Sequence, residues 1–141
     1  MSSLVQNIQS DLRDESDPLK AAFFPSFFKS EPGFNDQFLG VTVPKQRAIT
    51  KRYYKQISPE QVVELLHSEV HEERLTALMV WVLQYKHGDE QVQKKIYELY
   101  LKHTQWINNW DLVDTSARDI VGGYIFDKER DILDKLSKSK D

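Results

Sequence analysis

The most chemically suggestive stretch of the chain is residues 108–124, NNWDLVDTSARDIVGGY, which brings together an indole and two carboxylates. The asparagines before Trp110 and the glycine pair at 122–123 predict a helix between them. At about 100° per residue, one face of that helix is apolar and must be buried. The residues of this face are Val113, Ala117, Ile120, Val121 and Tyr124.

The two acids differ in their position relative to this apolar face. Asp114 lies about 80° from the centre of the face, whereas Asp111 lies about 140° from it and points toward water. Trp110 precedes Asp114 by four residues, so the two side chains share the rim between core and solvent. In a stack of helices, such a rim borders the concave groove. The pattern alone also allows Trp110 to be a packing residue and Asp114 to pair with Arg118.

A second candidate is the basic stretch 41–55, VTVPKQRAITKRYYK, which contains no acid although the chain has a net charge of −3. Arg47, Lys51 and Lys55 recur every four residues and would form one stripe on a helix. A local basic stripe can bind phosphates even on a mildly acidic protein. The alternative is a solvated charged face. The bases of the stretch are Lys45, Arg47, Lys51, Arg52 and Lys55.

Two histidines at helical spacing, His67 and His71, raise the possibility of a metal site. A helix break is predicted between them and no third ligand is evident, so we expect no metal. The sequence after His71 is not a zincin motif, because Leu75 occupies the position of the second histidine. We find no glycine-rich phosphate loop and no Ser/His/Asp arrangement, and the chain has no cysteine. We therefore expect no cofactor.

Helix signals run along the whole chain, and no segment alternates convincingly as a strand. The sequence Ser58-Pro59-Glu60-Gln61 resembles a capping box, and Gly88 followed by Asp89 predicts a helix end and a new start. Residues 30–43 form the one long irregular segment. The expected helices span 3–13, 18–30, 44–57, 71–86 and 128–137, with others starting after Ser58, Asp89 and the asparagines before Trp110.

These elements predict an all-α fold, with antiparallel helix pairs at roughly 59–86 and 89–122 stacked as an α-solenoid of HEAT-like type. The helix at 71–86 has a centre, Leu75 to Leu83, that is apolar nearly all round, and this helix should be the most buried. We expect residues 1–141 to form one helical-repeat domain. The helix at 128–137 lacks a partner, so we expect the natural polypeptide to continue beyond it.

Signals for secretion and membrane insertion are not found. The N-terminal residues lack a basic region and an apolar core, and the longest apolar run, Ala77 to Leu83, is too short to cross a bilayer. We expect a cytoplasmic protein.

Four stretches together resemble the AlkD-like DNA alkylation-repair glycosylases, in that family's order and spacing. They are Phe27-Phe28-Lys29, Asp36 to Val41 leading to Val43-Pro44 and Arg47, Val70 to Arg74 with Ala77-Leu78, and Asn109 to Asp114 with Gly122. The last is the most specific, because it combines a tryptophan, two acids and the cap in one turn. The resemblance covers nearly all of the chain.

The resemblance implies a right-handed superhelix of HEAT-like repeats whose concave face holds duplex DNA. It implies hydrolysis of the N-glycosidic bond of N3- or N7-alkylated purines, such as 3-methyladenine and 7-methylguanine. Asp114 and Trp110 match the family's catalytic acid and one of its catalytic tryptophans. A fixed carboxylate would stabilise the positive charge that grows on the deoxyribose, and an indole face would favour the same cation. The expected DNA-binding residues are Arg47, Lys51, Lys45, Thr42, Lys29 and Phe27.

The chain departs from the family's pattern at several positions. Thr42-Val43 stands where many members have a polar Gln-Thr pair, and Phe27 replaces a more usual tyrosine. The family's catalytic arginine and second tryptophan would lie beyond Asp141. The rival hypothesis is a non-catalytic HEAT-like scaffold that binds DNA or protein partners. The pair of Trp110 and Asp114 discriminates between them, because a scaffold has no need of an acid at the groove rim.

Overall fold

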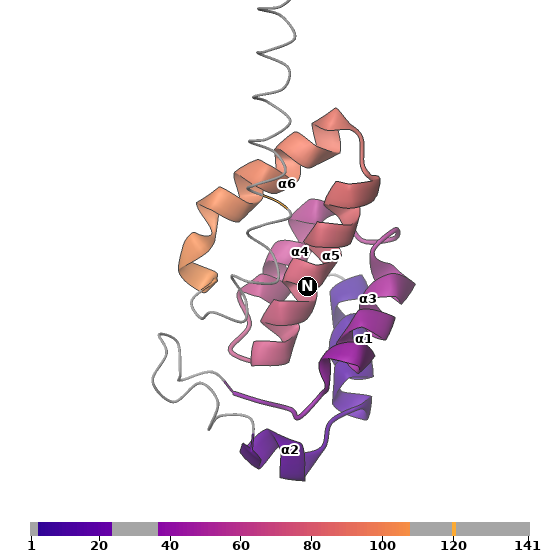
Figure 1. Cartoon of the computed structure of the whole chain (residues 1–141), viewed down its shortest axis with the longest axis vertical. Coiled ribbons are helices and arrows are strands. Elements are labelled where there is room, and N and C mark those ends of the chain that lie inside the picture. Colours follow the sequence, from indigo (N-terminus) through magenta and orange to yellow (C-terminus); the bar gives the residue numbers. More distant parts are fainter. Residues whose placement is uncertain (1–2, 24–36, 108–119, 121–141) are drawn as a thin grey trace, which may run out of the picture.

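The computed structural model of the protein describes residues 3–23, 37–107 and 120. These residues form an all-α structure, as predicted (Figure 1). In the described ranges no strand forms, and the one β-bridge joins Gln37 to Val70. The elements are α1 (Ser3–Asp14), α2 (Pro18–Phe23), α3 (Val43–Tyr53), α4 (Pro59–Leu66), α5 (His71–His87), α6 (Glu90–Lys102) and a short 3-10 helix (Thr104–Trp106).

The helix starts and ends that the sequence predicts at Ser58, Gly88 and Asp89 are seen in the structure, with local contacts that explain them. The Ser58 side chain accepts a hydrogen bond from the Gln61 backbone N–H at 3.2 Å, and the Ser58 N–H donates to Gln61 Oε1 at 2.9 Å. These two bonds complete a capping box for α4. Asp89 accepts from the Val92 N–H at 2.9 Å and caps α6. A Cβ added at Gly88 would lie 2.6 Å from Val92 Cγ1, so the α5–α6 turn needs glycine.

Side-chain hydrogen bonds between helices define their relative directions. Trp81 Nε1 near the end of α5 donates to the Pro59 carbonyl at the start of α4, so these two helices are antiparallel. Gln93 at the start of α6 donates to the Tyr85 carbonyl near the end of α5, and α6 is therefore antiparallel to α5 as well. In contrast, the Gln84 side chain donates to the Tyr54 carbonyl, which places the ends of α5 and α3 together.

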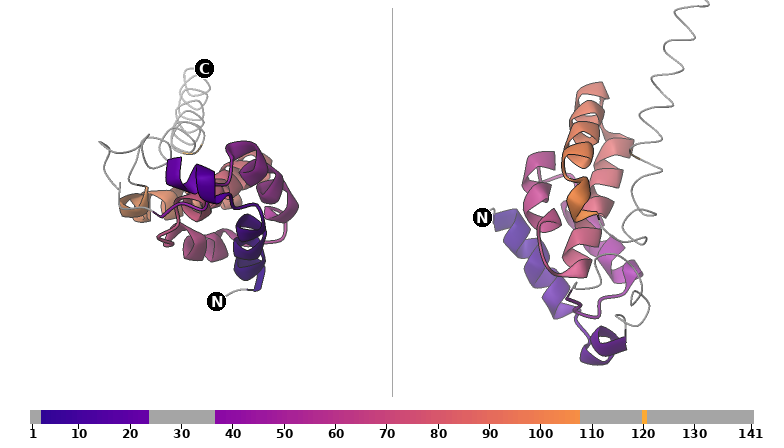
Figure 2. Two further views of the ribbon diagram at one scale, coloured as in Figure 1. Left: turned by 90° about the horizontal axis from the view of Figure 1, so that it is seen from below. Right: turned by 90° about the vertical axis from the view of Figure 1, so that its left-hand side faces the viewer.

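The helices consequently form two stacked layers of antiparallel pairs. Two ion pairs show that α1 and α3 are antiparallel. Asp11 of α1 pairs with Arg52 near the end of α3, and Glu15, just after α1, pairs with Lys45 near the start of α3. In one layer α4 contacts both α1 and α6, and in the other α3 packs on α5. Figures 1 and 2 show this arrangement from three directions. The stack has the layout of an α-solenoid, while the right-handed sense of the superhelix stays a prediction.

The core centres on α5, as predicted. Its side chains are buried on every side along most of its length, and Trp81, its largest, is fully buried. Ile120 also lies in this core with no exposed surface, as expected for the apolar face of its segment. Burying a large aliphatic or aromatic side chain contributes roughly 1.5–3 kcal/mol, so α5 supplies much of the stability of the stack.

The predicted helix at 44–57 is shorter in the structure. It ends at Tyr53, and a hydrogen-bonded turn follows in which the Ile57 N–H donates to the Tyr53 carbonyl. Ser58 is extended because a proline follows it, so the helix must stop before Ser58. Within the described ranges, no helix has the length and apolar character that crossing a bilayer requires. The expected helices at 110–122 and 128–137 lie outside the described residues, apart from Ile120.

Candidate nucleic-acid interface

The predicted basic stretch forms α3, and the structure divides its charges into two flanks. The buried face of α3 is made by Gln46, Ile49 and Thr50, which pack toward α5. At about 100° per residue, Arg47 and Lys51 lie on one side of this buried face. Lys45 and Arg52 then lie on the opposite side.

The flank of α3 that carries Lys45 and Arg52 is neutralised by acids of α1. Lys45 Nζ lies 3.2 Å from Glu15 Oε2, and Arg52 lies 3.2 Å from Asp11 Oδ2. The Tyr53 hydroxyl also donates to Asp11 Oδ2, at 2.7 Å. This hydrogen bond, burial and the charge of Asp11 raise the pKa of Tyr53 above its ordinary value of 10.0. The basic stretch 41–55 is therefore only partly free to meet a polyanion.

The other flank of α3 keeps its positive charge. Arg47 and Lys51 are exposed, and neither forms an ion pair with any residue that the structure describes. Four residues further on, Lys55 lies in the turn after α3, with its Nζ 5.8 Å from the centre of the Tyr54 ring. We call Arg47, Lys51 and Lys55 the free basic flank. It consists of the three residues of the predicted stripe, and it is the part of the basic stretch that can give its charge to phosphates.

The start of α3 is held in place by a buried carboxylate from α5. Glu72 is 1% exposed and accepts hydrogen bonds from three consecutive backbone N–H groups. The bonds from Leu39 and Val41 to Glu72 measure 3.0 Å each, and the bond from Gly40 measures 2.7 Å. Glu72 lies in the first turn of α5, where the helix dipole also favours a negative charge. This clamp fixes the segment that leads into Thr42 and α3.

Gly40 is required at the centre of this clamp for two reasons. Its φ of +83° belongs to the left-handed region, which side chains rarely adopt. In addition, a Cβ at this position would lie 2.1 Å from the Asp17 carbonyl oxygen. The Asp17 N–H donates to the Leu39 carbonyl at 2.9 Å, so the segment before α2 and the segment before α3 lie directly against each other.

The predicted contact residue Thr42 is half-buried and occupies the N-cap of α3. Its side chain makes no capping hydrogen bond to the start of the helix, unlike Ser58 and Asp89 at theirs. The proline that follows, Pro44, has no N–H to offer in the first turn. The Thr42 hydroxyl is thus not used to cap the helix beside the free basic flank.

The predicted catalytic residues Asp114 and Trp110 lie outside the described residues, as do Phe27 and Lys29. The structure does describe the turn before that segment. Arg74 is 3% exposed and donates from Nε to the Trp106 carbonyl at 3.0 Å. The entry to the segment 108–119 is therefore tied to the first turn of α5.

The two histidines considered as metal ligands separate in the structure. His67 follows α4 and His71 begins α5, so the predicted helix break between them is confirmed. His71 is buried and stacks on Phe38, with ring centres 4.9 Å apart. Across the described ranges, no three metal-ligating side chains gather.

Sequence reasoning missed a cluster in which His67 meets two other rings. His67 Nε2 lies 3.1 Å from His103 Nδ1, and the His67 ring stacks on Trp106 with centres 4.4 Å apart. Burial first, and then the charges of His67 and Lys102, lower the pKa of His103 below its ordinary 6.5. Only the helical spacing of His103 from Leu99 and Ile96, four and seven residues earlier, was visible in the sequence, and it did not identify His67 as a neighbour.

A two-layer stack of helix pairs that exposes one basic flank defines a helical-repeat protein suited to an anionic partner. Comparison with known families makes the assignment specific. The profile of the family described as DNA alkylation repair enzyme matches residues 8–141, and the chain belongs to this family. Its role is therefore DNA alkylation repair, and the resemblance seen in the sequence is confirmed. No curated protein and no solved structure matches the chain.

Proposed function

We propose that this protein is a DNA glycosylase that releases N3- or N7-alkylated purines from duplex DNA. Family membership supports DNA as its partner, and the free basic flank of α3 is the observation on the described residues that carries the proposal. Arg47 and Lys51 hold uncompensated charge on an exposed surface, which phosphate binding requires. A cytoplasmic location belongs to the same proposal.

The binding role follows from the charge pattern of α3. Phosphate contacts position a duplex without reading its sequence, and lysine and arginine are the residues that make them. Lys45 contributes less than Lys51 in this scheme, because a phosphate must compete with the carboxylate of Glu15 at 3.2 Å. Thr42, at the start of the same helix, would add a neutral hydrogen bond to the backbone.

The chemical step is assigned to Asp114 and Trp110 from the resemblance. An N3- or N7-alkylated purine is already cationic and is a good leaving group, so the reaction needs little general-acid help. Positive charge develops on the deoxyribose as the base departs. A carboxylate at Asp114 would stabilise that charge more in the transition state than in the ground state, and would orient the attacking water. The indole of Trp110 would offer its face to the same cation.

The deciding experiment incubates the protein with duplex DNA containing 7-methylguanine and measures the released free base. We expect Asp114→Asn to slow release by about 10²-fold or more while DNA affinity stays nearly unchanged, because it removes a charge used mainly in the transition state. Asp111→Asn is the matched control, with the same change of residue three positions away. It should cost under about 1 kcal/mol of stability and leave the rate intact.

The rival function is a helical scaffold that binds DNA or protein without catalysis. It predicts no release of free base, and equally small effects of Asp111→Asn and Asp114→Asn. Binding that persists without any base release would therefore replace the glycosylase proposal with the scaffold.

A further inference from the structure

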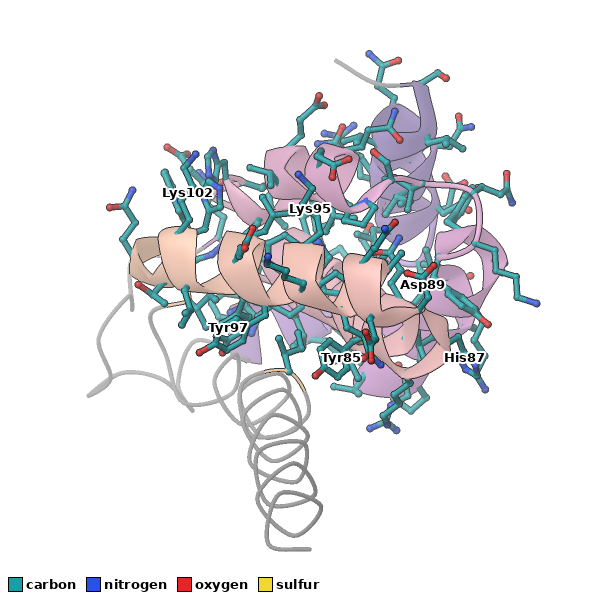
Figure 3. The ribbon with its side chains drawn as sticks, turned by 90° about the horizontal axis from the view of Figure 1, so that it is seen from above. Tyr85, His87, Asp89, Lys95, Tyr97 and Lys102 are labelled. Atoms are coloured by element: carbon teal, nitrogen blue, oxygen red, sulfur yellow. The ribbon has the colours of Figure 1, made fainter. Side chains whose placement is uncertain are left out.

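A pocket lies where the turn after α3 meets the α5–α6 turn. Its cavity volume is about 400 Å³, and its walls include Tyr54, Lys55, Gln84, His87 and Val92. This volume falls within the range of roughly 300–1,000 Å³ that is typical of small-molecule sites. Figure 3 shows His87 and Asp89 at this end of the molecule, with Lys102 at the other end of α6. The pocket is therefore separate from the cluster around His103.

The wall of the pocket is rigid and partly aromatic. Gln84 is 7% exposed, and its Nε2 donates to the carbonyls of Tyr54 at 3.0 Å and Ile57 at 2.7 Å. These bonds hold the turn after α3 against α5. Gln84 Oε1 is itself buried, so the contribution of Gln84 to the pocket is to hold this wall in place. The rings of Tyr54 and His87 lie with their centres 5.7 Å apart and form one side of the pocket.

The positive charge of Lys55 connects the pocket to the proposed DNA interface. Lys55 lines the pocket and is also the last member of the free basic flank, four residues after Lys51. A phosphate chain that follows Arg47 and Lys51 along α3 would therefore reach the pocket at Lys55. Aromatic rings beside a cationic groove are what proteins use to bind unpaired bases, because every base has a π-face and N–H donors on its edge.

We propose that this pocket binds one unpaired nucleotide of the DNA, with its base against Tyr54 and His87 and its phosphate at Lys55. The proposal rests on the proposed function for the presence of DNA on α3. A paired base cannot use the pocket, because its faces are covered by its neighbours in the stack. The site would thus favour DNA with a frayed end, a gap or an extruded nucleotide over an intact duplex.

The first test measures binding of deoxyadenosine 5′-monophosphate to the whole chain by heteronuclear NMR, with deoxyribose 5-phosphate as the probe that lacks a base. We expect the nucleotide to shift the signals of the pocket residues and to bind at least about fivefold more tightly than the sugar phosphate. His87→Ala removes an exposed ring and should abolish this preference. Val92→Phe fills the pocket and should do the same, with circular dichroism used to check the fold of both variants.

The second test compares a blunt duplex with the same duplex carrying one unpaired adenosine at an end. We expect the unpaired nucleotide to tighten binding, and expect His87→Ala to remove that gain without changing affinity for the blunt duplex. Lys51→Gln is the matched control, because it should weaken binding to both duplexes equally and leave the gain intact. Equal binding of nucleotide and sugar phosphate, or a gain that survives in folded Val92→Phe, would overturn the proposal. Because the nucleotide titration needs no duplex, failure of duplex binding alone would count against the proposed function and not against the pocket.

Discussion

The division of α3 into a neutralised flank and a free flank predicts unequal roles for two adjacent residues. Lys51 and Arg52 are neighbours with the same charge, and both are exposed. Arg52 lies 3.2 Å from Asp11, whereas Lys51 forms no ion pair with a described residue. We predict that Lys51→Gln lowers both the DNA affinity and its salt dependence, and that Arg52→Gln leaves the salt dependence unchanged.

The expected size follows from counterion release. Each phosphate contact contributes about 0.9 to the slope of log K against log salt for B-DNA. Between 50 and 200 mM salt, a fourfold range, the loss of one contact should change the ratio of wild-type to variant affinity by about 3.5-fold. Loss of both Arg47 and Lys51 should change that ratio by about 12-fold if the two contacts are independent. Lys45→Gln should have a smaller effect than Lys51→Gln, because Glu15 already competes for its charge.

The assay is fluorescence anisotropy of a labelled, undamaged duplex titrated at several salt concentrations, with thermal melting to confirm that each variant is folded. Undamaged DNA is sufficient, because phosphate contacts do not depend on the lesion. Identical slopes for Lys51→Gln and Arg52→Gln would show that the position of α1 does not decide which charges meet DNA. The separation of α3 into two flanks would then have no functional meaning.

Two further predictions concern the support of the interface. Glu72→Gln should destabilise the fold by about 2–4 kcal/mol in urea unfolding, because an amide cannot accept from all three N–H groups that the carboxylate holds. The control is Glu73→Gln, which should cost less, because the buried Glu73 side chain accepts one hydrogen bond, from Gln9. Equal losses of stability in the two variants would refute the clamp. For His103, the lowered pKa means that the unfolded chain binds more protons than the folded chain between that pKa and 6.5. The contribution of neutral His103 to stability is therefore present above pH 6.5 and is lost as the pH falls through the folded-state pKa. The loss of stability between pH 7.5 and 5 should therefore be smaller in His103→Asn than in the wild type, and identical losses would contradict this.

Local sequence signals predicted much of the fold, because they act within a few residues. The capping box at Ser58, the turn at Gly88 and Asp89, and the burial of the helix after His71 all depend on neighbours in the chain or on one helical period. The end of α3 was placed four residues too late. Its periodicity continues to Ile57, and the proline after Ser58 marks only the latest point at which the helix can end.

The sequence separated Arg47, Lys51 and Lys55 as one stripe, but it could not show that the other bases of the stretch form ion pairs. The partners of Lys45 and Arg52 are Glu15, just after α1, and Asp11 of α1, and nothing local indicates these contacts. Glu72 is a similar case. It stands in a run of charged residues that indicates a surface, whereas tertiary packing buries it at 1% exposure against three N–H groups far earlier in the chain. The apolar helix that follows directly was the one signal that the charged residues of its first turn are also drawn into the core.

The first turn of α5 links the two halves of the proposed chemistry. Glu72 holds the segment that leads into α3 and its free basic flank, and Arg74 holds the turn that leads into residues 108–119. Both side chains are almost fully buried on the most buried helix of the fold, so neither can shift without disturbing the core. The segment that leads into the free basic flank and the turn that ends at Ile107 are therefore held by one rigid helix. The carboxylate proposed to stabilise a short-lived cation, Asp114, follows that turn in the sequence, and a preorganised charge stabilises a transition state without having to move.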